Sequence, residues 1–256
     1  MLASSSSGNA TFVSSGRTRI LIDAGLSRKE IIARLQAIGE TPEALDAVLI
    51  SHEHSDHVCG LLPLIKKFRL PVYVSRLTVS TIPWEDHEWG ENTPKIRLFQ
   101  AGETFQIGDL EIGTFTVPHD AVDPVGFRVR SEDACAGIVT DLGYIPDSVK
   151  YHLRDCNLLL LESNHDLDML KVGPYPWSVK QRVMGRNGHL SNDTVSQFIL
   201  EALDGRLRTL ILGHLSEHNN HPALVQMSAA QALFKKCLGP RLVVAEPRTQ
   251  SEVFTV

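Results

Sequence analysis

The stretch ISHEHSDHVCG (residues 50–60) concentrates side chains that bind metal ions or exchange protons. Three histidines, His52, His54 and His57, stand there with a glutamate and an aspartate, directly after an apolar run. Imidazole and carboxylate groups are ligands for zinc, manganese and iron, and four of them within six residues can serve two adjacent cations. The zinc-protease helix motif H-E-x-x-H is excluded, because Asp56 stands where that motif requires histidine. The pattern therefore predicts a metal site rather than a solvated loop.

One loop cannot complete two coordination spheres, so further ligands must come from other parts of the chain. Three candidates each follow an apolar, strand-like run: His119 after GTFTVP, Asp141 after GIVT, and His214 after TLILG. Strand ends that share one edge of a sheet would bring these side chains together. A carboxylate on a turn, such as Asp141, could bridge two cations. His218 stays open as a substitute for His214.

The elements that must position these residues are visible as short apolar runs and helical patterns. Runs rich in valine and isoleucine, separated by glycine, proline and aspartate, predict strands; they lie at 10–15, 19–25, 47–51, 71–75, 95–99, 104–117, 125–130, 137–141, 157–163, 209–214 and 241–246. Helical patterns occur at 27–39, 58–68, 146–155, 191–203 and 222–236. Ser27 and Glu30 form a capping box at the start of the first helix.

Some segments fit neither pattern. Residues 84–94 and 171–188 are expected to be loops that contact substrate. The serine-rich segment 4–8 is of low complexity, and the first strand is expected to be short or missing. A strand-rich first half followed by alternating strands and helices favours an α+β fold, with two mixed sheets flanked by helices. No linker is visible, which predicts one domain over residues 1–256.

Composition limits the class of protein. The chain has 256 residues, 43% of them hydrophobic, and a net charge of −5, so there is no overall electrostatic bias toward nucleic acid or anionic membranes. No signal-peptide pattern is visible, and no apolar run approaches the roughly 20 residues that a membrane span needs. The four cysteines lack metal-binding spacing and fit reduced thiols. These features predict a soluble protein of the cytoplasm.

With these residues in view, the chain resembles the metallo-β-lactamase superfamily, and within it the YycJ (WalJ) group, which is related to ribonuclease Z. The motifs SSSSGNATFV, ILIDAG, SHEHSDH, VPHD, TDLG, LESNHD, GHLSN and HLSEHNN occur in the family's order and span nearly the whole chain. The resemblance implies an αββα sandwich with a dinuclear metal site along one rim. It implies two divalent cations, with zinc the first choice and manganese or iron the alternatives.

The resemblance also assigns ligands at matching positions. It implies a first metal held by His52, His54 and His119, a second held by Asp56, His57 and His214, and a bridging Asp141. Asp23 in ILIDAG matches a family aspartate that lies beneath the metal loop and orients ligands without binding the metal.

Two further residues match a catalytic position of ribonuclease Z-like enzymes. His189 in GHLSN corresponds to a catalytic histidine, and Glu162 would be its carboxylate partner. Ribonuclease Z lacks a counterpart of Leu190 in this motif. The alternative is that His189 caps the helix that begins near Ser191.

Several nearby residues could contact substrate. Lys180, Arg182 and Arg186 precede His189 and are expected to contact phosphate groups. The aromatic residues of the predicted loops could stack on bases or close a core; they are Trp84, Trp89, Tyr175 and Trp177. His87 is expected to be a loop histidine, and Cys59 a small buried side chain of the following helix.

Together these features predict a dinuclear metal-dependent hydrolase, specifically a phosphodiesterase or nuclease. A metal-bridging hydroxide near Asp56 and Asp141 would attack phosphorus, while His189 stabilises charge or protonates the leaving oxygen. The resemblance implies DNA or RNA as substrate, with stepwise 5′-to-3′ cleavage. Two alternatives stay open: a hydrolase of a small ester, thioester or β-lactam, and a metal-bound regulatory protein without turnover. The oligomeric state is left open.

Overall fold

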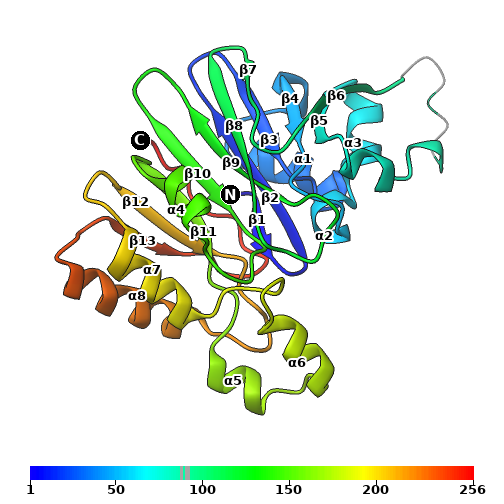
Figure 1. The fold of residues 1–256 in the computed structure, drawn as a ribbon. Coiled ribbons are helices and arrows are strands. Elements are labelled where there is room, and N and C mark those ends of the chain that lie inside the picture. The colour runs from blue at the N-terminus through cyan, green and yellow to red at the C-terminus, as the bar shows by residue number, and fades with distance from the viewer. Residues whose placement is uncertain (87–88, 90–92) are drawn as a thin grey trace.

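Two β-sheets stack face to face, and helices cover the outer face of each sheet (Figure 1). This computed structural model describes residues 1–86, 89 and 93–256. The predicted α+β sandwich is therefore confirmed. The expectation for His87 lies outside the described residues. None of the described helices is long and apolar enough to cross a membrane.

The first sheet has six strands in the spatial order β1-β2-β3-β4-β5-β6. They are β1 (Ala3–Ser5), β2 (Gly8–Ser14), β3 (Arg19–Ile22), β4 (Ala47–Leu49), β5 (Pro71–Ser75) and β6 (Lys95–Phe99). The first three strands pair antiparallel, and β3 to β6 pair parallel. Strand β1 has three residues and lies at the edge, as the short or missing first strand of the sequence analysis anticipated.

The second sheet has seven strands in the order β13-β12-β11-β10-β9-β8-β7. They are β7 (Thr104–Ile107), β8 (Leu110–Thr116), β9 (Val125–Arg130), β10 (Cys135–Val139), β11 (Leu158–Glu162), β12 (Thr209–Gly213) and β13 (Arg241–Val244). Strands β7 to β10 pair antiparallel, and β10 to β13 pair parallel. Strand β8 therefore runs in the same direction as β10, β11 and β12, and all four end at one rim.

The α-helices of the described residues are α1 (Arg28–Ala37), α2 (Ser55–Val58), α3 (Leu61–Phe68), α4 (Asp147–Leu153), α5 (Leu167–Val172), α6 (Trp177–Val183), α7 (Asn192–Ala202) and α8 (Pro222–Lys236). The predicted N-cap, Ser27, begins α1: its Oγ accepts a hydrogen bond from the backbone N–H of Glu30 at 3.3 Å. The Glu30 carboxylate accepts from the Ser27 hydroxyl at 3.0 Å, where a full capping box would have it accept from the Ser27 backbone N–H. Helices α1 and α3 pack on the first sheet, and α4, α7 and α8 pack on the second (Figure 1).

Strand residues alternate between two apolar layers, as a pleated strand buried on both faces requires. In β3, Ile20 and Ile22 belong to the core between the sheets, whereas Leu21 belongs to the core beneath α1 and α3. In β12, Ile211 faces the core between the sheets and Leu210 faces α4, α7 and α8. Each sheet is therefore packed against an apolar core on both faces. This packing makes the strand ends rigid positions for the side chains that follow them.

Two predicted loops differ in the structure. Residues 171–188 are not a loop, because α5 ends and all of α6 lies within this segment; Asp166 caps α5 by accepting from the backbone N–H groups of Asp168 and Met169. In the other segment, Trp84 begins a short 3-10 turn, and Trp84 and Trp89 pack against the core beneath the first sheet.

Candidate metal centre

Histidines and aspartates from both sheets meet at one rim, where strands end. The HEHSDH loop follows β4 and continues into α2, while Asp23 follows β3. From the second sheet, His119, Asp141 and His214 follow β8, β10 and β12, and β11 ends in Glu162. The carboxyl ends of these strands point to the same rim, which is why residues separated by most of the chain become neighbours.

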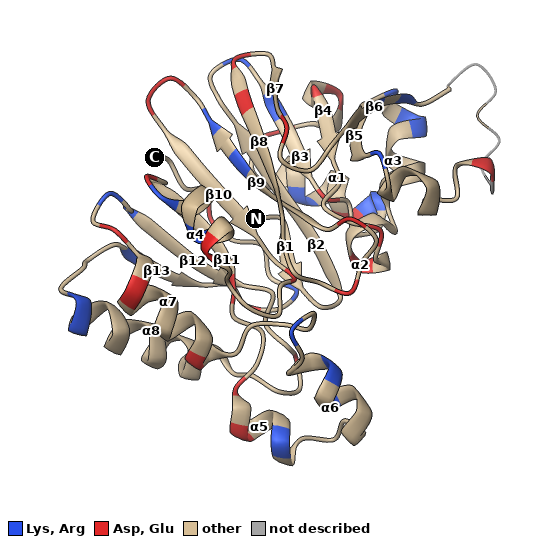
Figure 2. Ribbon diagram, in the orientation of Figure 1, with Lys and Arg blue, Asp and Glu red and all other residues tan. Residues whose placement is uncertain are grey.

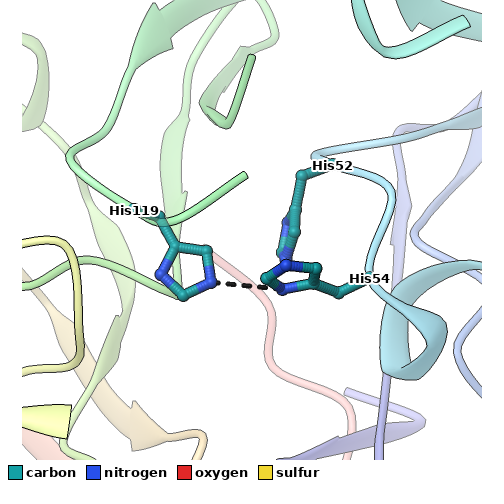
Figure 3. A group of neighbouring side chains, drawn as sticks. All are labelled: His52, His54 and His119. Atoms are coloured by element: carbon teal, nitrogen blue, oxygen red, sulfur yellow. Dashed lines mark hydrogen bonds between the residues drawn. The ribbon is translucent and has the colours of Figure 1, made fainter. Parts of the chain in front are cut away.

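Three histidines form the first group (Figure 3): His52, His54 and His119. One nitrogen atom from each lies within 4.8 Å of the others. His54 Nδ1 and His119 Nε2 are 3.3 Å apart. The Nδ1 of His119 lies 3.2 Å from the carbonyl oxygen of Gly188, so the proton belongs on Nδ1 and the Nε2 lone pair is directed at the group.

A second group contains Asp56, His57 and His214, again with ligand atoms within 4.8 Å of one another. The carboxylate atom Asp56 Oδ2 lies 3.5 Å from His57 Nε2 and 3.7 Å from His214 Nε2. Asp141 stands between the two groups. Its Oδ2 is 3.2 Å from His57 Nε2, and its Oδ1 is 3.8 Å from His119 Nε2. Oδ1 also lies 3.5 Å from His214 Nδ1 of the second group. Asp141 is therefore within reach of both groups, as a bridging carboxylate would be.

The inner atoms of this cluster fit divalent cations. His52 Nε2, His214 Nε2 and Asp141 Oδ2 are buried and have no hydrogen-bond partner among the described residues. Buried polar atoms almost always have partners, and leaving one unpaired costs about 1–3 kcal/mol. Neutral imidazole nitrogens and carboxylate oxygens are suitable ligands for zinc, manganese and iron. The rim thus offers a set of ligands for divalent metal ions.

Asp23 supports the first sheet's half of the cluster from below. Its Oδ1 accepts from the backbone N–H of Ser51, and its Oδ2 accepts from Ser51 Oγ, both at 2.8 Å. Its Oδ2 also lies 2.8 Å from His57 Nδ1. This contact puts the His57 proton on Nδ1 and leaves Nε2 for a ligand role. Asp23 therefore lies where the sequence analysis expected an orienting carboxylate.

Glu162 has the same role in the second sheet's half. This fully buried carboxylate accepts from His189 Nδ1 at 2.7 Å, the pairing expected from sequence. The same oxygen also accepts from His214 Nδ1 at 2.6 Å, which the sequence analysis did not anticipate. The other oxygen accepts from the backbone N–H groups of Leu142 and Leu190. One carboxylate thus orients two imidazoles of the centre.

Charge pairing shifts the pKa values of His214 and Glu162 more strongly than burial does. Burial opposes protonation of His214, but the negative charge of Asp141 and the charge and hydrogen bond of Glu162 raise its pKa to about 10. Burial opposes ionisation of Glu162, yet the charge of His189 and hydrogen bonds from both histidines lower its pKa to about 2. The second sheet's half of the centre is therefore a carboxylate paired with imidazolium groups.

In the first sheet's half, the pKa values of two histidines are shifted in opposite directions. Burial opposes protonation of His57, but Asp141 and Asp23 raise its pKa well above the ordinary value. For His52, burial and the charge of His57 lower the pKa well below its ordinary value. A cation arriving at this half meets one neutral imidazole and one that must first release a proton.

Three residues of the cluster have an unusual backbone. Asp23, Asp141 and His214 take positive φ angles of 62°, 60° and 55°. This left-handed conformation is uncommon for residues other than glycine and concentrates at functional sites. At the end of a strand it turns the chain sharply, so that the side chain faces the rim rather than continuing the alternation of the strand.

Other predicted site residues lie outside the cluster or differ from expectation. His218 contacts the ring of Tyr175, so the structure brings His214 rather than His218 into the centre. Cys59 is exposed, and its thiol donates to the carbonyl of Gly25, so the expectation of a buried side chain was wrong. Trp177 is 62% exposed on α6.

The three residues that were predicted to contact phosphate have different surroundings in the structure. Lys180 is buried, and its Nζ donates to the carbonyl of Lys171 at 2.7 Å, which removes it from the candidate substrate contacts. Arg182 and Arg186 line an open hollow of about 480 Å³ with Asp120, Gly185 and Asn187. Arg182 Nε donates to Asp120, the neighbour of His119, at 2.5 Å.

Asn9 also belongs to the centre, although it was not predicted from the sequence. Its amide nitrogen lies 3.0 Å from His57 Nε2 and 3.3 Å from Asp56 Oδ2, and it also donates to the carbonyl of Ser5. Asn9 follows the turn between β1 and β2, so it links the N-terminal hairpin to the metal loop. The motif SSSSGNA contained the signal, but a single asparagine in a serine-rich stretch does not by itself predict contacts with residues 47 and 48 positions later.

Known proteins resemble the chain in sequence and in fold. Residues 18–214 match the family model of the beta-lactamase superfamily domain. Exodeoxyribonuclease WalJ of Streptococcus pneumoniae is 36% identical over 239 residues, covering 93% of this chain and 89% of WalJ. Exodeoxyribonuclease YycJ of Bacillus anthracis is 34% identical over 240 residues, covering 93% and 90%.

A solved structure supports the same fold. The metallo-β-lactamase fold protein YhfI of Bacillus subtilis has a TM-score of 0.71 at 20% sequence identity, covering 96% of this chain and 93% of YhfI. At this identity the likeness concerns the fold alone, whereas the family match and the curated relatives establish kinship. The chain therefore belongs to the metallo-β-lactamase superfamily, and within it to the group that contains WalJ and YycJ.

Proposed function

We propose that this protein is a metal-dependent nuclease that hydrolyses phosphodiester bonds of DNA, stepwise from the 5′ end. The observation that carries the proposal is the convergence of two ligand groups on Asp141, with buried, unpartnered ligand atoms directed into the centre. Two relatives that match 93% of the chain are exodeoxyribonucleases, which supports nucleic acid as the substrate class and DNA as the first choice. They do not favour a small ester, thioester or β-lactam substrate.

The proposed ligand sets follow the two groups. One cation would be held by His52, His54 and His119, the other by Asp56, His57 and His214, with Asp141 between them. The nitrogen-rich donor set makes zinc the first choice, ahead of manganese or iron. When bound, such cations would supply an activated water nucleophile and neutralise charge on the reacting phosphate.

The surrounding residues would orient and protonate the reacting groups. Asp56 and Asp141 would accept hydrogen bonds from the attacking water and so fix its direction. His189 lies beside the centre, with its ring centroid 5.2 Å from that of His119. Burial lowers the pKa of His189, but the charge and hydrogen bond of Glu162 outweigh this and raise it. A protonated His189 is suited to stabilise charge on phosphate or to protonate the leaving oxygen.

Two arginines would bind the substrate backbone. Figure 2 shows acidic and basic residues mixed over the strand ends and helices, with basic residues on α6. Arg182 binds Asp120 through Nε, and among the described residues its terminal amino groups have no partner. Arg186 stacks on Tyr144, its guanidinium carbon 4.7 Å from the ring centroid. Guanidinium groups held in this way bind phosphate in a fork geometry.

We also propose a cellular compartment for the protein. The four cysteines are free thiols in the structure, which is the usual state in a reducing compartment. We therefore place the activity in the cytoplasm, with nucleic acid as the partner. Fractionation of cells that produce the chain at native levels would test the compartment.

The function is tested by offering purified protein several substrates with zinc or manganese: single-stranded DNA labelled at the 5′ or 3′ end, RNA, bis-p-nitrophenyl phosphate and nitrocefin. We expect mononucleotides to be released from the 5′ end of DNA. His189→Ala should retain the metal ions and lose about 10²–10⁴-fold in kcat, whereas His218→Ala should leave kcat unchanged. Nitrocefin turnover without phosphodiester cleavage would refute the nuclease, and normal turnover by His189→Ala would refute the role of His189.

A further inference from the structure

Two cysteines that the metal centre does not use lie side by side in the second sheet. Cys135 is the first residue of β10, and Cys156 precedes β11. They are 21 positions apart in sequence, but their Sγ atoms are 3.7 Å apart and both residues are buried. The other two cysteines, Cys59 and Cys237, are exposed.

The backbone holds the pair in place. The N–H of Asn157 donates to the carbonyl of Cys135 at 2.7 Å, and the Asn157 side chain accepts from the Cys135 N–H at 2.9 Å. Gly137 lies two residues further along β10 and therefore on the same face as Cys135. A Cβ at Gly137 would lie 3.4 Å from Cys156 Sγ and 3.0 Å from the side chain of Leu153. The glycine thus leaves the space that Cys156 occupies.

An arginine contacts only one of the two thiols. The Nε–H of Arg128, on the neighbouring strand β9, donates to Cys135 Sγ at 3.1 Å. The hydrogen bond from Cys156, together with Arg128, lowers the pKa of Cys135 to about 6 in spite of burial. The same contact with Cys135, together with burial, raises the pKa of Cys156. At neutral pH one sulfur is therefore a thiolate and its neighbour is a thiol that keeps its proton.

We infer that Cys135 and Cys156 form a peroxide-reactive thiol pair that closes to an intramolecular disulfide. The Cys135 thiolate attacks one oxygen of hydrogen peroxide, the O–O bond breaks, and hydroxide leaves, which gives a sulfenic acid on Cys135. Cys156 then attacks that sulfur: the S–S bond forms, the S–O bond breaks, and water leaves with the proton of Cys156. The hydroxide takes up the proton that Cys135 had released, so overall two thiols and one peroxide give one disulfide and two waters.

The surroundings of the pair favour a small oxidant. A cavity of about 10 Å³ lies beside Cys156, lined also by Leu153, Phe198 and Leu207. This volume has room for about one water-sized molecule. A bulky oxidant such as a glutathione disulfide would not fit there. Cys135 does not line this cavity, so an oxidant held in it must pass Cys156 to reach the Cys135 sulfur, and a small peroxide is the oxidant best suited to do so.

The test treats the full-length protein with hydrogen peroxide, blocks free thiols with iodoacetamide, and maps peptides by mass spectrometry without reduction. We expect a Cys135–Cys156 linked peptide, lower in mass by two hydrogen atoms than the two free peptides, which dithiothreitol reverses. Cys59 and Cys237 serve as internal controls and should remain alkylated at the same dose. Arg128→Met should slow the oxidation of Cys135 about tenfold, and Arg97→Met, an exposed arginine of the other sheet, should not change the rate.

A variant of the second cysteine, Cys156→Ser, tests the proposal independently of the arginine variants. In Cys156→Ser the disulfide cannot form, so a sulfenic acid should accumulate on Cys135 and react with dimedone. Circular dichroism of each variant verifies folding. The proposal is overturned if peroxide converts Cys135 of the wild-type protein to sulfinic acid without the linked peptide. It is equally overturned if dimedone labels Cys59 before Cys135 in Cys156→Ser.

Discussion

Two buried carboxylates, Asp23 and Glu162, contact the candidate ligands from behind. Each faces Nδ1 of a histidine, His57 or His214, so the Nε2 atom of that histidine is the one left for a cation. At this scale the geometry explains why residues outside the two proposed ligand groups are part of the centre. A histidine ring free to rotate would have to be ordered each time a cation binds.

The proposed ligand sets predict that His214, rather than the nearby His218, binds a metal ion. His214→Ala removes a ligand nitrogen of the second group, so one of the two cations should be lost and activity should fall at least about 10²-fold. His218→Ala is the matched control, because that ring lies against Tyr175 outside the centre. Metal content by inductively coupled plasma mass spectrometry checks both variants. Equal loss of metal in both would contradict the assignment.

The protonated histidines predict that metal binding releases protons. The pKa of His214 is raised to about 10 and that of His57 is raised well above its ordinary value, so both rings hold protons at neutral pH. A cation must displace them, and zinc affinity should therefore rise with pH up to about 10, the pKa of His214. Titration calorimetry in buffers of different ionisation enthalpy measures the number released. An observed enthalpy that does not depend on the buffer would count against this protonation state.

At the scale of the elements, strand ends were predictable and short helices were not. The runs before Asp141 and His214 are strongly apolar, and the run before His119 alternates apolar with small or polar residues; all three end abruptly, so their position at a rim could be inferred from sequence alone. Helices α5 and α6 have six and seven residues, too few to show a helical period. Contacts that sequence does not reveal stabilise them, such as the hydrogen bond from Lys180 to the carbonyl of Lys171.

The predicted N-cap of α1 can be tested directly. Ser27→Ala removes the side-chain oxygen that accepts from the backbone N–H of Glu30, so the free energy of unfolding should fall by about 1 kcal/mol. Ser178→Ala, an exposed serine within α6, should change it by less than about 0.5 kcal/mol. Urea unfolding of the zinc-saturated protein measures both. Catalysis should be unaffected, and a cap variant as stable as the wild type would contradict the role of Ser27.

At the scale of the whole molecule, the centre joins the two sheets. Asp23 and the HEHSDH loop belong to the first sheet, and His119, Asp141 and His214 belong to the second. The sheets also share the apolar core between them and a backbone bridge between Ser5 and Leu215. Sequence similarity placed these residues in one centre, but the shared contact of Glu162 with two histidines and the approach of Asn9 depend on tertiary packing that no local pattern encodes.

A centre that spans both sheets should stabilise the entire fold when it binds metal. Zinc at about 100 times its Kd should add about 2.7 kcal/mol, which raises Tm by roughly 5–10 °C for a chain of this size. Differential scanning calorimetry with zinc and with a chelator measures the shift. Asp141→Asn should lose most of it, because the residue that faces both groups is altered. The same shift in wild type and Asp141→Asn would place the stabilising ion elsewhere.

The most direct test of the central claim is a crystal structure of the zinc-loaded protein, with anomalous data collected on both sides of the zinc absorption edge. The account predicts two anomalous peaks roughly 3.5–4 Å apart, one beside His52, His54 and His119 and the other beside Asp56, His57 and His214, with Asp141 in contact with both. No peak among these residues, or a peak only at another site, would contradict it.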